Sequence, residues 1–150
     1  MTLEEEIYTN KFDSEVHKAT INLMFTAHWL RSRLGVEFKR YGITPEQYNV
    51  MRILKGKYPD KMCVKDIGKR MIEKNSNVPR ILDKLVRKDL ILRQQSEMDK
   101  RETQSTLTEK GLQLLQKVTD HIKSSKSLQL QLDEQTAHQL NTILENLRKE

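Results

Sequence analysis

The amino-acid sequence predicts a fold that is mainly α with a small β wing. Three observations predict it. Apolar residues recur every three or four positions near both ends of the chain, as they do along one face of a helix. Two shorter helical patterns lie in the middle of the chain, separated by a short connection. Directly after them come two stretches that are compatible with β structure and flank a polar turn.

The composition is that of an ordinary folded domain. A chain of 150 residues suits one domain with a single core. Its 36% hydrophobic and 32% charged residues favour a soluble, mainly helical protein. No apolar run approaches the roughly 18 residues needed to cross a bilayer, and the stretch MTLEEEIYTNKFDSE is acidic. We therefore expect a cytoplasmic protein with no membrane partner. The single cysteine, Cys63, excludes an internal disulfide framework and fits a reducing compartment.

The net charge of +6 is confined to one segment of the chain. The segment from Lys61 to Arg101 contains twelve Lys and Arg but only six Asp and Glu, whereas the remainder of the chain contains fifteen basic and fifteen acidic residues. Such a local basic surplus is typical of a module that binds a polyanion, because the neutralisation of phosphates supplies much of the affinity. A solvated charged face is the commoner explanation for any single helix, but it accounts less well for the confinement.

The N-terminal part predicts one long amphipathic helix over residues 14–41. Its apolar stripe repeats at intervals of four and three residues and consists of Val16, Thr20, Leu23, Ala27, Leu30 and Leu34. Gly42 ends this helix. Thr44 is the predicted N-cap of the next helix, because Pro45 follows it at the first helical position and Glu46 places a negative charge in the first turn.

Two more amphipathic helices are predicted after the basic segment. One begins at Thr108 and runs to about Lys126, and the other begins at Asp133. The helices at the two ends of the chain carry apolar faces that need a surface to bury them. A coiled-coil-like pairing of the first and last helices, within the chain and with a second copy, satisfies both. We therefore expect a homodimer with the middle of the chain projecting from it.

The basic segment itself predicts a helix-turn-helix. Residues 64–71 form a short helical pattern, residues 72–75 connect it, and a second helix begins near Ser76. With Ser76 as the N-cap, Pro79 occupies the third helical position, where a missing N–H costs nothing. The exposed stripe of this helix then consists of Asn77, Arg80, Lys84 and Arg87 or Lys88. Two predicted strands, over residues 90–95 and 102–107, follow it and make a wing whose tip is SEMDKR.

The order of these motifs resembles the MarR family of bacterial winged-helix regulators. GITPEQYNVMRILKG resembles the family's second helix, VKDIGKRM and NSNVPRILDKLVRKDLI resemble its helix-turn-helix, and MDKRETQSTLTEKG resembles its wing and the return to the dimerisation helices. The resemblance runs from about Gly42 to Gly111. Its most specific part is the pair Asp99 and Arg101 followed by LTEKG. Two departures are Pro79 and Asp89, which replaces a usual glycine but tolerates a left-handed conformation.

The resemblance implies an obligate homodimer on a pseudo-palindromic site in double-stranded DNA. It implies one domain over 1–150, with a winged helix-turn-helix DNA-binding lobe over 44–107 and dimerisation helices over 14–41 and 108–150. Seven side chains are the predicted DNA contacts, namely Ser76, Asn77, Arg80, Lys84, Arg87, Lys100 and Arg101.

The wing and the start of the recognition helix have specific expected roles. By the resemblance, Arg101 enters the minor groove and Asp83 and Asp99 support the wing, with Asp83 holding Arg101 in position. Asn77 is the better candidate for base readout, because the hydroxyl of Ser76 serves as the cap. The alternative is a charged surface whose ion pairs are worth roughly 0 to 1 kcal/mol each, with simple capping at the helix start.

Such regulators also place an effector pocket between the dimer helices and the DNA-binding lobe, so a small-molecule effector is a further candidate partner. The candidate pocket residues are Phe25, His28, Trp29, Tyr48 and Met51, for all of which core packing is the alternative. No two histidines lie four positions apart and no carboxylate–histidine cluster accompanies them, so we expect no metal and no cofactor.

The sequence thus predicts a sequence-specific transcriptional regulator, acting as a ligand-responsive repressor. It contains no nucleophile motif, no glycine-rich phosphate loop and no paired acid and base, and we expect no enzymatic activity. The alternative functions are a non-specific architectural DNA-binding protein and a helical protein-interaction module. Tight binding to one operator, beyond a salt-dependent background, distinguishes the regulator from both.

Overall fold

The computed structural model describes residues 1–149 and is mainly helical with one small sheet, as the sequence predicts. The elements are α1 (Leu3–Ile7), α2 (Glu15–Arg40), α3 (Pro45–Lys55), β1 (Met62–Cys63), α4 (Val64–Arg70), α5 (Val78–Arg87), β2 (Ile91–Gln95), β3 (Thr103–Leu107), α6 (Glu109–Ser124) and α7 (Glu134–Asn146). The short elements α1 and β1 are absent from the sequence prediction. All the other elements begin within about two residues of their predicted positions, and so do the ends of those elements for which an end was predicted.

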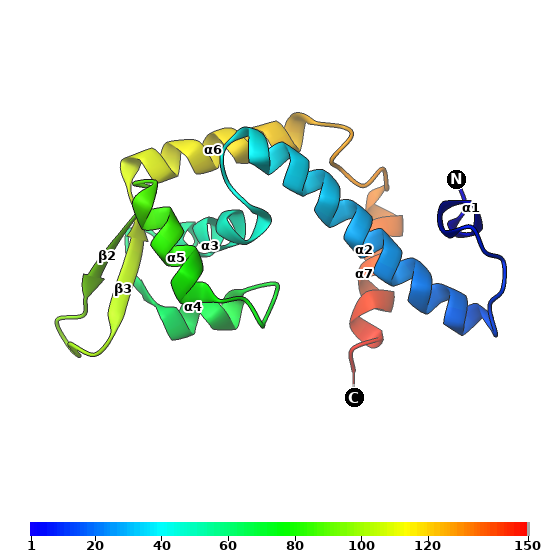
Figure 1. Cartoon of the computed structure of the whole chain (residues 1–150), viewed down its shortest axis with the longest axis horizontal. Helices are drawn as coiled ribbons and strands as arrows, with labels where there is room; N and C mark the ends of the chain where they lie inside the picture. Colours follow the sequence, from blue (N-terminus) through cyan, green and yellow to red (C-terminus); the bar gives the residue numbers. More distant parts are fainter. Residues whose placement is uncertain (150) are drawn as a thin grey trace.

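The molecule consists of a lobe and an extended helical part. Figure 1 shows α3, α4, α5 and the strands gathered at one end, with the β2–β3 hairpin projecting from the lobe. The long helix α2 leads away from the lobe toward α1 and the N-terminus, and α6 leads from the hairpin toward α7. Among residues 1–149, no helix combines the length and the apolarity needed to cross a membrane.

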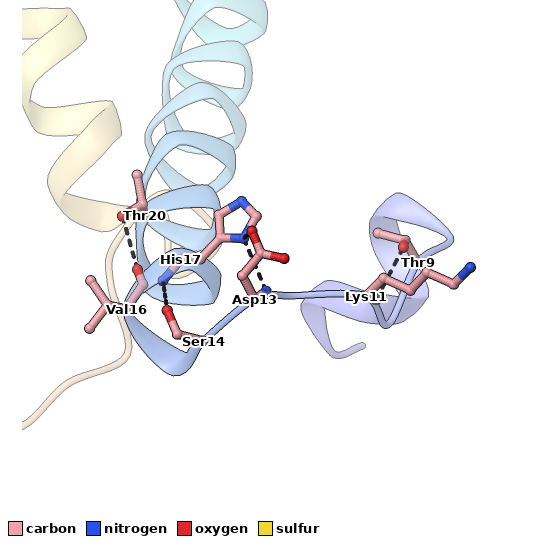
Figure 2. Close-up of polar contacts among 7 residues, drawn as sticks. All are labelled: Thr9, Lys11, Asp13, Ser14, Val16, His17 and Thr20. Atoms are coloured by element: carbon pink, nitrogen blue, oxygen red, sulfur yellow. Dashed lines mark hydrogen bonds and ion pairs between the residues drawn. The ribbon is translucent and has the colours of Figure 1, made fainter.

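The first turn of α2 is closed by side chains of its own sequence. Figure 2 shows the Ser14 hydroxyl accepting a hydrogen bond from the backbone N–H of His17, at 3.1 Å. The backbone N–H of Asp13 donates to the His17 ring at 3.2 Å, and the Thr20 hydroxyl donates to the Val16 carbonyl at 2.9 Å. Because the N–H groups of a first turn have no partner within the helix, this cap determines where α2 begins.

The sheet joins the hairpin to the start of α4. Its order is β1-β3-β2 and both pairings are antiparallel, with Ile91 opposite Leu107 and Gln95 opposite Thr103. Met62 pairs with Ser105, so β1 ties the residues before α4 to the base of the wing. Two residues are too few to show an alternating pattern in a sequence, which is why β1 was not predicted.

The core of the molecule lies in the lobe, around α3. This helix packs against α2, α4, α5, α6 and β3. The fully buried apolar side chains include Val50 and Met51 from α3, Ile67 from α4, and Leu82 and Leu85 from α5. The apolar side of α5 is therefore fixed within the lobe, and its basic side faces outward.

The extended helical part buries much less of its apolar surface. Helix α7 contains no fully buried residue, and Phe38 is the only one in α2. The exposed apolar side chains of these helices and of the residues before α7 are Val16, Leu23, Met24, Trp29, Val36, Leu130, Leu132, Ile143 and Leu147. A folded monomer rarely leaves so much apolar surface on two helices, so these faces are available to another chain.

Candidate nucleic-acid interface

The helix α5 begins one residue later than the sequence predicts. Its N-cap is Asn77, whose side-chain oxygen accepts a hydrogen bond from the backbone N–H of Arg80 at 3.1 Å. Ser76 still belongs to the preceding turn, because its N–H donates to the Glu73 carbonyl and its own carbonyl accepts from Val78. The prediction of Ser76 as the cap is therefore wrong. Pro79 falls at the second helical position, where its missing N–H again costs nothing.

This correction moves the capping role from Ser76 to Asn77. The Asn77 side chain is exposed, and its oxygen is engaged in the cap while its amide N–H groups point to no protein acceptor in the described residues. The Ser76 hydroxyl is buried without a hydrogen-bond partner in the same part of the chain. Asn77 thus remains able to donate to a base edge, but its substitution also removes the cap.

The outer face of α5 carries exposed cations at helical spacing. Arg80, Lys84 and Arg87 are all exposed and follow one another along one side of the helix. Lys88 turns back toward the lobe, where its ammonium donates to the carbonyl of Gly42 and, at 3.1 Å, to Gln47. Burial lowers the pKa of Lys88, and the positive charge of Lys84 lowers it further. The structure therefore selects Arg87, and not Lys88, for the exposed stripe.

The junction between α5 and the wing is a left-handed turn. Asp89 has a φ of 57°, which is a left-handed conformation. This agrees with the expectation that Asp89 occupies a position where glycine is usual. Its carbonyl accepts a hydrogen bond of 2.6 Å from the hydroxyl of Thr108, the residue that also caps α6. The chain therefore passes from α5 into β2 and returns into α6 around one shared contact.

The wing tip is shaped by its own side chains. The Ser96 hydroxyl accepts hydrogen bonds from the backbone N–H groups of Met98 and Asp99, at 3.2 and 3.4 Å. The Asp99 carboxylate accepts one from the N–H of Arg101 at 3.0 Å. Lys100 and Arg101 are exposed at this tip. The turn thus presents two cations beyond the end of the paired strands.

The carboxylate of Asp83 does not hold Arg101, contrary to the prediction. It pairs with Arg93, which lies on β2. Arg93 is opposite Ser105 in the sheet, whereas Arg101 lies in the turn that precedes β3. Asp83 therefore connects α5 to strand β2 of the wing. Its ion pair does not involve Arg101 at the wing tip.

The predicted effector residues do not converge on one cavity. Met51 is completely buried in the lobe, and Tyr48 stacks on Phe38 with ring centroids 4.6 Å apart. The Tyr48 hydroxyl also lies 3.0 Å from that of Thr119 on α6. For these two residues the alternative interpretation, core packing, is the one that the structure supports.

The other three predicted effector residues lie on α2. Trp29 is 38% exposed and is covered by the guanidinium of Arg33, 4.7 Å from the ring centroid. Phe25 is half-buried. Of the five residues, His28 lines a groove that has a volume of about 410 Å³ and runs between α2, α3 and the turn before α5, and the other four are not part of its lining. Its walls are mostly apolar and include Leu30, Pro45, Met71 and Ile72.

The remaining chemistry-bearing residues form no separate site. The part of the chain that the structure describes contains no group of three His, Cys, Asp or Glu side chains placed to hold a metal ion. Cys63 is half-buried in front of α4. Its hydrogen bond, together with one from Lys69, lowers the pKa of the Asp66 carboxyl.

Comparison with known proteins agrees with this geometry. The model of the MarR family matches residues 43–103, which contain the helix-turn-helix and most of the wing. YkoM, an HTH-type transcriptional regulator of Bacillus subtilis, is 34% identical over 80 residues, which are 53% of this chain. The match spans about half of that relative, 51% of its length.

Solved structures extend the likeness to almost the whole chain. The MarR family transcriptional regulator AbsC of Streptomyces coelicolor superposes with a TM-score of 0.77 at 20% identity, over 94% of this chain and all of AbsC. MepR of S. aureus, in its complex with DNA, superposes with a TM-score of 0.73 at 24% identity, over 85% of this chain and 94% of MepR. At these identities the superpositions establish the fold, including the terminal helices.

Proposed function

Because the model of the MarR family matches residues 43–103 of this chain, we propose that it is a MarR-type, sequence-specific DNA-binding transcriptional regulator that acts as a homodimer. The observation that carries this proposal is the outer face of the lobe, where the exposed cations of α5 and those of the wing tip are free of protein partners within residues 1–149. YkoM and AbsC are named as transcriptional regulators and not as enzymes, in agreement with the lack of a catalytic motif in this sequence.

In this proposal each part of the lobe reads a different groove. The helix α5 lies in the major groove, with Asn77 at a base edge and Arg80, Lys84 and Arg87 at bases or phosphates. The wing places Arg101 in the neighbouring minor groove, with Lys100 at the backbone. In the proposal, residues 44–107 form this DNA-binding lobe, and residues 14–41 and 108–150, of which Glu150 lies outside the described residues, supply the dimerisation helices that hold two lobes on one side of the duplex.

We further propose that the protein is a repressor whose DNA binding responds to a small molecule. The groove between α2 and the lobe supports this, because a ligand there would contact both the dimerisation helix and the turn before α5. A mostly apolar wall with a few polar groups is the usual composition of small-molecule sites. This groove replaces the five residues predicted from the sequence, of which it retains only His28.

Mapping of genomic binding sites followed by footprinting tests the function. Two recognition helices related by a two-fold axis meet successive major grooves, so we expect a protected pseudo-palindrome with half-site centres about 10 bp apart. Protection of a single half-site would contradict the dimeric arrangement. The architectural alternative predicts equal, strongly salt-dependent binding to mapped and scrambled sequences.

Replacement of Arg101 by alanine is expected to weaken binding to many sequences by a similar factor. The minor groove offers a degenerate pattern of donors and acceptors, so this contact depends on charge and groove width more than on sequence. Titrations on mapped and scrambled duplexes at several salt concentrations measure the effect. Lys126→Ala removes the same charge from an exposed loop outside the lobe and should leave both affinities unchanged. A loss confined to the mapped sequence would show that Arg101 reads bases directly.

Two substitutions of Asn77 separate its two roles. Serine retains a capping oxygen but lacks the amide N–H groups, so Asn77→Ser should reduce discrimination at one symmetric pair of bases by roughly 1 to 3 kcal/mol with little change in stability. Asn77→Ala should reduce it as much and should also lower the free energy of unfolding by about 1 kcal/mol, because the cap is lost. Competition titrations and denaturant unfolding measure the two effects. If Asn77→Ser discriminates between bases as well as the wild type does, Asn77 caps the helix but does not read a base.

A further inference from the structure

An arginine of α2 connects this helix to the two segments that surround the start of the recognition helix. The guanidinium of Arg31 forms ion pairs with Glu46, in the first turn of α3, and with Glu73, in the turn before α5. One planar guanidinium can engage two carboxylates at once through its separate N–H groups. The three side chains are partly exposed, at 46%, 25% and 44%, and lie where water and ions can reach them.

The two carboxylates lie between two hollows of the surface. On one side is the apolar groove beside α2, which is lined by Arg31, Glu46 and Glu73 among others. On the other side is a recess of about 380 Å³ that Glu46 and Glu73 also line. The opposite wall of this recess belongs to α5 and carries Asn77, Arg80 and Lys84. The recess is therefore part of the face that we propose to meet DNA.

The formal charges of this recess cancel unless Arg31 is counted. Arg80 and Lys84 carry two positive charges, and Glu46 and Glu73 carry two negative ones. Phosphates that approach α5 would therefore meet no net attraction from these four side chains. Arg31 adds a positive charge directly to the two carboxylates and restores the basic character that DNA binding requires.

The turn before α5 does not depend on Arg31 for its position. The side chain of Asn49, on α3, accepts a hydrogen bond of 2.9 Å from the backbone N–H of Ile72. Met71, at the end of α4, is buried in the core. Loss of Arg31 should thus leave the turn in place and change chiefly its charge.

We propose that Arg31 is a positioning residue of the DNA interface, which neutralises Glu46 and Glu73 and keeps them from repelling the phosphate backbone. The inference rests on the proposed function and adds to it a residue of the dimerisation helix. It acts through the two carboxylates and makes no contact with DNA itself. Because α2 carries Arg31, any shift of α2 relative to the lobe changes the charge that DNA meets at α5.

Charge-neutral variants test this proposal on a fluorescent 30-bp duplex of arbitrary sequence, because the expected effect is independent of sequence. At low salt, Arg31→Gln should weaken binding roughly five- to tenfold, and the loss should shrink as added salt screens the two uncompensated carboxylates. Arg33→Gln removes the same charge two residues away, where the guanidinium covers Trp29, and should change affinity less than about twofold. Denaturant unfolding of each variant verifies that it is folded.

Removal of the carboxylates gives the decisive comparison. Addition of Glu46→Gln and Glu73→Gln to Arg31→Gln should restore at least the wild-type affinity, because no uncompensated negative charge remains. The same two changes in the otherwise wild-type chain should tighten binding several-fold, and Arg31→Lys should bind nearly as the wild type does. The double variant Glu46→Gln, Glu73→Gln and the single variant Arg31→Lys both retain a cation at position 31. They therefore test the effect of these charges on DNA affinity even if Arg31→Gln fails to fold.

The outcomes separate this inference from the proposed function. Unchanged binding by a folded Arg31→Gln, or a weakened Arg31→Gln that the carboxylate changes do not rescue, overturns the role of Arg31 while the wild-type protein still binds DNA. Unchanged binding by the two carboxylate changes alone overturns it as well. If the wild-type protein binds no duplex at any salt concentration, the proposed function fails, and this inference fails with it.

Discussion

Deletion of residues 133–150 is expected to convert the protein into a monomer that binds duplex DNA about 100-fold more weakly or worse. Helix α7 contains no fully buried residue, and Ile143 and Leu147 expose 56% and 65% of their surface one helical turn apart. If a second copy covers this face, the deletion removes the interface. A monomer would then lose the avidity of two linked lobes, which commonly exceeds a single affinity by 10²- to 10⁴-fold. Sedimentation and DNA titration measure the two losses.

A single charge on the same face tests the interface without shortening the chain. Ile143→Glu should disrupt dimerisation because a carboxylate would be buried without a partner. Asn141 is exposed on the opposite side of α7, so Asn141→Glu adds the same charge there and should leave the dimer intact. A truncated chain that still sediments as a dimer would place the interface elsewhere. A stable monomeric wild-type protein would exclude the proposed arrangement altogether.

The starts of four helices could be predicted from the sequence because each depends on a local contact. Ser14, Thr44, Thr108 and Asp133 each accept a hydrogen bond from a backbone N–H three residues later. Such a cap is complete within one turn and requires no information about the rest of the fold. The same local argument is weaker at α5, where Ser76 and Asn77 are both good caps. The choice of Asn77 depends on how the preceding turn closes at Glu73.

The sequence predicts which basic side chains of the functional site are exposed, but it does not predict which ion pairs the neighbouring side chains form. The exposed cations of α5 and the wing follow from helical spacing and from the order of the motifs. The partner of Asp83 does not, because it depends on how far β2 and β3 extend past α5. The ion pairs of Arg31 join residues 15 and 42 positions away, and no sequence pattern indicates them. The aromatic residues assigned to an effector pocket were misplaced because Tyr48 and Met51 lie on the core side of α3.

The glycine of LTEKG has a packing role that the structure makes explicit. Gly111 is the third residue of α6, and its N–H donates to the capping hydroxyl of Thr108 at 2.9 Å. A Cβ at this position would lie 2.0 Å from the carbonyl oxygen of Leu90 and 3.0 Å from its carbonyl carbon. A Cβ cannot lie 2.0 Å from a backbone carbonyl oxygen, so either α6 or the start of β2 would have to move.

Neither segment can move without the loss of other interactions. The Leu90 N–H donates to the Leu85 carbonyl at 3.0 Å, and the Leu90 carbonyl accepts from Thr108 at 3.1 Å. The next residue, Ile91, is buried and paired with Leu107. The carbonyl that would meet the new methyl group is therefore held by the end of α5, by the start of α6 and by the sheet.

Gly111→Ala is accordingly expected to lower the free energy of unfolding by about 3 kcal/mol or more, at the upper end of what added atoms usually cost in a packed interior. Denaturant unfolding followed by circular dichroism measures this change. Gly35→Ala is the matched control, because its Cβ would meet only Pro45, at 3.9 Å, within the long helix α2. That change should raise stability by up to about 1 kcal/mol, since alanine is the better helix former. Equal unfolding midpoints for Gly111→Ala and the wild type would show that α6 can shift away from Leu90, and the wing and the terminal helices would then not be rigidly joined at this point.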